Sequence, residues 1–129
     1  MDFTSIVYIV SGDEMYKIMK KKYPDRIIIP FREDLSKGEY HSFLIDEEFI
    51  NERSKQWNIS KDEYVNNMKD IIDIDVCKKY VLVFGEDDCC KANLSFVLQY
   101  LKKKEYLNTI DVQIVDEYSL EIIKEYQYN

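Results

Sequence analysis

The sequence predicts a single-domain α/β protein with a three-layer, Rossmann-like fold and a mainly parallel sheet of roughly four strands. Two observations support this: short, continuously apolar runs alternate with segments of helical periodicity, and the length of 129 residues fits one domain. Continuous apolar runs are typical of strands buried on both faces of a parallel sheet. The chain contains no repeat, linker or low-complexity block, so residues 1–129 are expected to form one domain.

Four apolar runs predict the strands of this sheet. They are IVYIV (6–10), RIIIP (26–30), which Pro30 is expected to end, YVLVF (80–84) and DVQIV (111–115).

Five segments between and after these runs predict helices: residues 14–22, 46–57, 60–72, 91–103 and 119–126. SKDE (60–63) has the form of a capping box, with Ser60 as the N-cap. In 91–103, Leu94, Val97, Leu98 and Leu101 follow the spacing of one buried helical stripe. The order β-α-β-(α-α)-β-α-β-α favours a parallel sheet with right-handed crossovers.

Composition excludes several classes of protein. A net charge of −7 argues against direct nucleic-acid binding, which needs a basic stripe, although it is compatible with a local basic pocket or with phosphate mimicry. No apolar run approaches the length of about 18 residues that a membrane helix needs, and the first residues lack the features of a secretory signal. The three cysteines (Cys77, Cys89, Cys90) are an odd number and fit a reduced thiol state. We therefore expect an acidic cytoplasmic protein without a membrane partner.

The three glycines, Gly12, Gly38 and Gly85, each lie in a polar loop near a predicted strand end. The loops are SGDE (11–14), FREDLSKGEYH (31–41) and FGEDDCCKAN (84–93). Because ligands of open parallel sheets bind outside the carboxyl ends of the strands, these loops predict a polar site at that edge. The residues they bring there are Asp13, Arg32, Glu33, Asp34, Ser36, Glu86, Asp87 and Asn93. The alternative is that the loops are simply polar and that Asp13 and Asp88 cap helices.

Four stretches, in this order, resemble a known family: IVYIVSGDEMYKIMK, REDLSKG, ERSKQW and VLVFGEDDCCKANLSFVLQYL. The chain is similar over roughly residues 6–118 to the bacterial family catalogued as domain of unknown function 1835. The positions that match the family pattern are Gly12, Asp13, Asp34, Leu35, Ser36, Gly38, Arg53, Trp57, Asp87, Cys90, Asn93 and Leu94. The resemblance implies a fold and a site location but no reaction.

The chain departs from that family pattern at several positions. Glu39 stands where the family has Pro, and Val83 where it often has Trp. Met15 and Tyr16 replace small residues after the Gly-Asp pair. These departures are compatible with a degraded or a specialised site.

Nucleophilic chemistry would require a base beside a nucleophile. Cys90 opens a predicted helix, where the helix dipole lowers a thiol pKa, and His41 is the only histidine. The two would form a dyad if their loops meet. The alternative is that Cys90 is a small packed residue.

Metal chemistry has a different candidate set. The cysteine spacing does not support structural zinc, whereas Asp13, Asp34 and Asp87 follow three strands and offer the oxygen ligands that Mg²⁺ prefers. The alternative is that these aspartates fix turns through hydrogen bonds to loop amides.

Anion binding is the third possibility. No P-loop or dinucleotide fingerprint occurs. Arg32 and Arg53 are candidates for a bidentate phosphate clamp, and Arg53 precedes Trp57 by four residues, so the two side chains share one helix face. The alternative is an ordinary cation–π pair between Arg53 and Trp57.

Together these patterns favour binding of a small nucleotide-like or phosphorylated anion at the carboxyl edge. In this hypothesis the contacts come from Gly12, Asp13, Arg32, Asp34, Ser36, Gly38, Arg53, Trp57, Asp87 and Asn93, with Arg53 neutralising the anion. A Mg²⁺-dependent phosphoryl-transfer or hydrolytic enzyme is one alternative, and an acidic protein-interaction module or inhibitor is another. The sequence assigns no catalytic residue and no cofactor.

Overall fold

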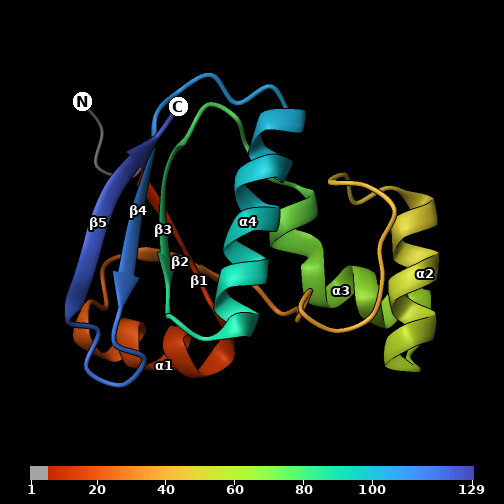
Figure 1. Ribbon diagram of the computed structural model, residues 1–129, viewed down its shortest axis with the longest axis horizontal. Coiled ribbons are helices and arrows are strands. Elements are labelled where there is room, and N and C mark those ends of the chain that lie inside the picture. The colour runs from red at the N-terminus through yellow and green to blue at the C-terminus, as the bar shows by residue number, and fades with distance from the viewer. Residues whose placement is uncertain (1–5) are drawn as a thin grey trace.

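The computed structural model describes residues 6–129 and contains one sheet of five strands in the order β2-β1-β3-β4-β5 (Figure 1). The first four are β1 (Ile6–Val10), β2 (Ile27–Pro30), β3 (Lys79–Phe84) and β4 (Ile110–Val115), and they run parallel. These strands confirm the four apolar runs. The expectation about a secretory signal rests partly on residues 1–5, which lie outside the described residues.

The fifth strand, β5 (Ile122–Tyr128), pairs antiparallel with β4 and corrects both the strand number and the helix expected at 119–126. Leu120, with φ of 61°, and a turn around Asp116 reverse the chain just before it. Tyr126 and Tyr128 then alternate with polar residues and lie opposite Val112 and Ile110 of β4. Side chains two residues apart point to the same face of a strand, so a strand paired with the free edge of β4 buries both tyrosines on one face.

The four remaining helices are confirmed: α1 (Gly12–Lys22), α2 (Glu47–Trp57), α3 (Lys61–Ile72) and α4 (Asp88–Lys103). Three of them begin at a side-chain cap. Asp46 accepts from Phe49 N at 2.9 Å, Ser60 from Glu63 N at 3.1 Å, and Asp87 from Cys90 N at 2.7 Å. Each cap satisfies a first-turn amide that has no partner within the helix.

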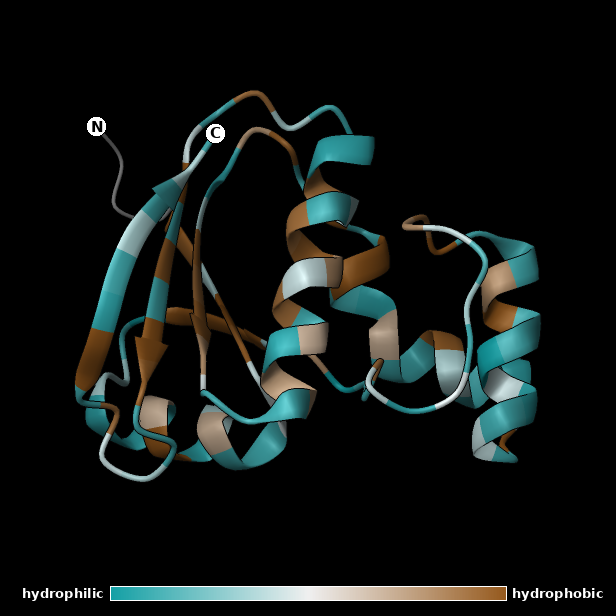
Figure 2. Ribbon diagram, viewed as in Figure 1, coloured by the Kyte–Doolittle hydropathy of each residue, from teal (hydrophilic) through white to brown (hydrophobic). Residues whose placement is uncertain are grey.

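The helices form two layers around the sheet (Figure 1). On one face, Met15 and Met19 of α1 pack against Val81 and Val83 of β3. On the other face, α4 packs against alternate strand residues such as Leu82, and α3 and then α2 lie beyond α4, joined to the same core cluster (Figure 1). The centre of the sheet and the packed side of α4 are apolar (Figure 2). No helix within residues 6–129 combines the length and apolar character needed to cross a membrane.

Candidate functional site

The switch point of the sheet lies between β1 and β3, which are neighbours in the sheet. The chain leaves β1 through α1 toward β2 on one side, and leaves β3 through α4 toward β4 on the other. The two helices pack on opposite faces. The loops after these strands therefore diverge and leave room for a ligand at the carboxyl edge.

A hollow of about 290 Å³ occupies this position, and we call it the switch-point hollow. Its polar lining consists of Ser11, Glu14, Asp87, Cys89, Cys90 and Glu117, and Met15 and Ile18 supply an apolar wall. Asp87, one of the sequence-predicted site residues, lies here, and Gly12 follows Ser11 directly. The sequence did not single out Ser11 or Glu117. Glu117 was missed because it lies in a loop that the helix expected at 119–126 would have placed differently.

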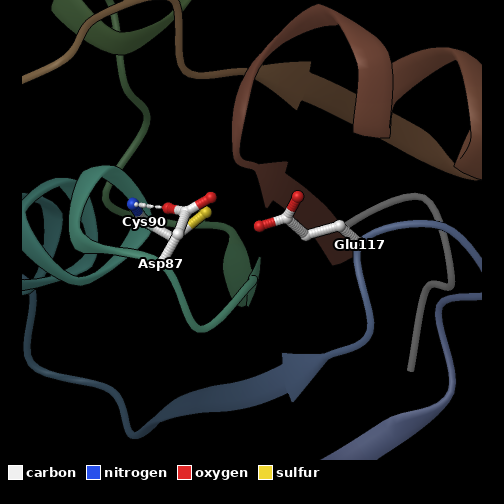
Figure 3. A group of neighbouring side chains, drawn as sticks. All are labelled: Asp87, Cys90 and Glu117. Carbon is white, nitrogen blue, oxygen red and sulfur yellow. Dashed lines mark hydrogen bonds between the residues drawn. The ribbon is translucent and has the colours of Figure 1, made fainter.

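Two carboxylates and a thiol meet in the hollow (Figure 3). Ligand atoms of Asp87, Cys90 and Glu117 all lie within 4.8 Å of one another. The close approach of the two carboxyls lowers the pKa of Asp87 and raises the pKa of Glu117. Glu117 is thus the carboxyl that takes up a proton first as the pH falls, and the pair offers hard oxygen ligands to a cation.

Cys90 is buried and is held by Ser11, whose Oγ lies 2.9 Å from the Cys90 Sγ. Burial raises the pKa of Cys90, and burial together with Asp34 raises the pKa of Cys89 to about 12. The lowered thiol pKa expected at a helix start is therefore wrong for Cys90, because desolvation outweighs the helix dipole. The dyad with His41 does not form either, since the imidazole lies 3.3 Å from Asp46 at the start of α2.

The N-terminus of α1 faces the same hollow. Its N-cap residue, Ser11, makes no side-chain capping hydrogen bond among residues 6–129, in contrast to the caps of α2, α3 and α4. Gly12 has φ of +87°, and a Cβ there would have no atom within 4 Å. First-turn amides and the positive end of the helix dipole are therefore directed at open space.

A second group of sequence-predicted residues has a structural role. Arg53 is 1% exposed, and its guanidinium binds both carboxylate oxygens of Glu33, at 2.7 and 3.0 Å. It also donates to the carbonyls of Asp34, Lys37 and Glu39. The expectation that Arg53 neutralises a bound anion does not fit this geometry, because its donors are already used to hold the loop after β2.

Three further side chains hold that loop. Tyr64 and Trp57 donate to the Glu33 carboxylate at 2.6 and 2.7 Å. Buried Asn93 donates to the Glu33 carbonyl at 2.6 Å and accepts from Leu35 N at 2.9 Å. Burial acts to raise the pKa of Glu33, but the bonds from Arg53 and Tyr64 outweigh it and the pKa lies below its ordinary value. Asn93 is therefore a tie between α4 and the loop, and the expected ligand contact is not its role.

Gly38 belongs to the same loop. Its φ is +74°, and a Cβ would come within 1.8 Å of Gln56 Oε1 and 2.9 Å of an Arg53 nitrogen. The glycine therefore allows the backbone to approach the guanidinium, and its expected contact with a ligand is replaced by this structural contact.

A second hollow, of about 370 Å³, lies along the loop and is lined by Arg32, Asp34, Trp57, Ile59, Tyr64 and Asn67. Arg32 donates to Asp13 at the start of α1, with 2.8 Å between Nε and Oδ1. Ser36 and Lys37 bind the Asp34 carboxylate and, with Cys89, outweigh its burial, so the pKa of Asp34 is lowered.

The expected metal set is not assembled. Asp13 pairs with Arg32, Asp34 binds Ser36 and Lys37, and Asp87 lies beside Glu117. The structure thus divides the predicted site residues between two hollows and a buried network that shapes the loop.

The fold and the hollow define an α/β protein with a polar cleft at the switch point of its sheet. Neither a protein-family model, a curated protein nor a solved structure matches this chain. The resemblance to domain of unknown function 1835 stays a prediction.

Proposed function

We propose that this Rossmann-like protein binds a small phosphorylated or nucleotide-like ligand at the carboxyl edge of its sheet. The observation that carries the proposal is the switch-point hollow, into which the uncapped N-terminus of α1 is directed. Backbone amides at such a terminus bind phosphate through hydrogen bonds and through the helix dipole. Ser11 adds a hydroxyl, and Gly12 leaves the approach to the amides open.

The organic part of the ligand would occupy the second hollow. Trp57 is 41% exposed and offers an aromatic surface for a planar group. Arg32 lies between this hollow and the start of α1, and its ion pair with Asp13 is solvent-exposed. Within residues 6–129 only its Nε is hydrogen-bonded, to Asp13, so its other donors are available to an anion, unlike those of Arg53.

The carboxylates of Asp87 and Glu117 would repel an anion unless a cation lay between them. Mg²⁺ is commonly held by one or two carboxylates together with substrate phosphates. We therefore expect phosphate-containing ligands to bind more tightly with Mg²⁺ or Mn²⁺ than without.

Titration calorimetry with AMP, ribose 5-phosphate and inorganic phosphate, each with and without Mg²⁺, tests the proposal. Arg32→Gln should weaken binding of the phosphorylated probes by about tenfold, as expected for loss of one charge-assisted contact. Lys79→Gln is the matched control, because Lys79 also forms an exposed ion pair, with Asp111, and is 43% exposed against 44% for Arg32. Lys79 lies at the amino end of β3 and should not affect binding. If no probe binds, or if both variants bind as the wild type does, the proposal is wrong.

The second candidate is metal-assisted phosphoryl transfer or hydrolysis. The grouping of Asp87, Cys90 and Glu117 within 4.8 Å favours it. Consumption of a phosphorylated probe that requires Mg²⁺ or Mn²⁺ and is lost in Glu117→Gln would distinguish this activity from binding alone.

A further inference from the structure

A third concave surface lies between α4 and the β4–β5 hairpin, and we call it the α4–β5 groove. It has a volume of about 410 Å³. Its middle is lined by Leu94 and Leu98 of α4, Ile114 of β4 and Tyr126 of β5. Lys91, Lys124 and Glu86 line it as well. The groove therefore combines an apolar wall with charged groups.

The groove exists because β4 continues into a hairpin. A crossover helix after β4 would have covered this face of the sheet, but the chain returns directly as β5. Alternate residues of β5, Lys124, Tyr126 and Tyr128, line the groove beside α4. Toward the end of β5, the Lys102 ammonium of α4 lies 5.4 Å from the centre of the Tyr128 ring, which lines the groove.

The opposite end of the groove is cationic. Lys91 lies in the first turns of α4, and Lys124 is paired with Ile114 near the carboxyl end of β4. Within residues 6–129 neither lysine has a carboxylate oxygen within 4.0 Å, and the Lys124 ammonium lies over the Tyr126 ring, 5.5 Å from its centre. Two lysines against the single carboxylate of Glu86 give this end a positive charge in a chain whose net charge is −7.

We propose that the α4–β5 groove binds a small amphipathic acid. The apolar body would pack against Leu98, Ile114 and Tyr126, and the acid group would lie between Lys91 and Lys124. The volume falls within the range of about 300–1,000 Å³ typical of small-ligand sites. The groove and the switch-point hollow have no lining residue in common, although Glu86 of the groove directly precedes Asp87 of the hollow.

Titration of the ¹⁵N-labelled full chain with octanoate, octanol and octylammonium, followed by NMR, tests the assignment. Octanoate should shift the amides of Leu94, Ser95, Leu98 and Ile114 in a saturable way, with a Kd roughly fivefold below that of octanol, as expected for exposed ion pairs with two lysines. Octylammonium should bind more weakly than octanol, because the same lysines repel it.

Three variants sharpen this test. Lys124→Glu should remove the preference for octanoate over octanol, and Ser95→Trp should abolish binding of both, because exposed Ser95 lines the groove and an indole there would fill it. Lys61→Glu makes the same change of charge on α3, outside the groove, and should bind like the wild type. The proposal is overturned if octanoate binds no tighter than octanol, or if the shifted amides line the switch-point hollow instead.

Discussion

The buried ion pair between Arg53 and Glu33 gives the sharpest prediction about this fold. The two side chains are 1% and 0% exposed, and they are joined by two hydrogen bonds, the shorter of 2.7 Å. Arg53→Met keeps most of the apolar stem but leaves the carboxylate of Glu33 buried without its cation. Removing one partner of a buried pair costs about 3–5 kcal/mol, so we expect a loss of that size in the free energy of unfolding, measured with urea at pH 7.

The pH dependence separates this explanation from a loss of packing. In the wild type the pKa of Glu33 is lowered, so its contribution is fully present above its unfolded value of about 4.5 and is lost as the pH falls through the folded pKa. In Arg53→Met, burial would raise the pKa of Glu33, and the variant should regain stability relative to the wild type as the pH falls from 7 toward 5.

A double variant provides the control. Glu33→Gln combined with Arg53→Met removes both charges and should recover part of the lost stability, because no unpaired charge stays buried. A loss below about 1 kcal/mol in Arg53→Met, the size found for surface ion pairs, would refute the reasoning. A loss of stability in Arg53→Met that did not change with pH would also refute it.

Three other perturbations are expected to have distinct effects. Tyr64→Phe removes a hydrogen bond of 2.6 Å to a buried carboxylate and should cost about 1.5–3 kcal/mol in urea unfolding at pH 7, whereas an unchanged midpoint would contradict that contact. Gly38→Ala, where φ is +74° and a Cβ would meet Gln56, should cost at least about 1 kcal/mol in the same assay, and a neutral result would show that the loop adopts another conformation. Glu117→Gln removes a carboxyl whose pKa is raised by its close contact with Asp87 and by charge repulsion from it, so it should raise the Tm by up to about 2 °C at pH 7 and less at pH 4. A larger gain at pH 4 than at pH 7 would exclude that repulsion.

The fold was largely predictable because its signals are local. The four parallel strands appear as apolar runs, and the helices after them carry the expected stripes, such as Leu94, Val97, Leu98 and Leu101. The helix predicted for the segment that forms β5 was wrong for a physical reason. Its alternating tyrosines gain burial only by pairing with β4, and this is a tertiary contact that propensity does not encode.

The sequence indicated which loops lie at the carboxyl edge of the sheet, but it did not indicate what each residue in them contacts. A glycine in a polar loop indicates a strand end, and Gly12 does lie at the start of α1. Gly38, in contrast, makes room for the side chains of Gln56 and Arg53. Likewise, Asn93 lies one residue before a buried stripe and is itself 1% exposed, so its amide serves the loop after β2 and not a ligand. Sequence patterns identified polar residues near the edge, but only burial and bonding geometry distinguish those that face solvent from those that support the loop.

Arg32 and Arg53 make this distinction testable in one protein. Arg32 is 44% exposed with one ion pair, so Arg32→Gln should change stability by less than about 1 kcal/mol while weakening the binding of phosphorylated probes. Arg53 is buried, so its replacement should lower stability first and affect binding only through the shape of the loop. Loss of binding in an Arg53 variant is therefore no evidence for a direct contact with a ligand. A folded Arg53→Met protein, kept well below its melting temperature, should still bind any ligand whose anion is held by α1 and Arg32.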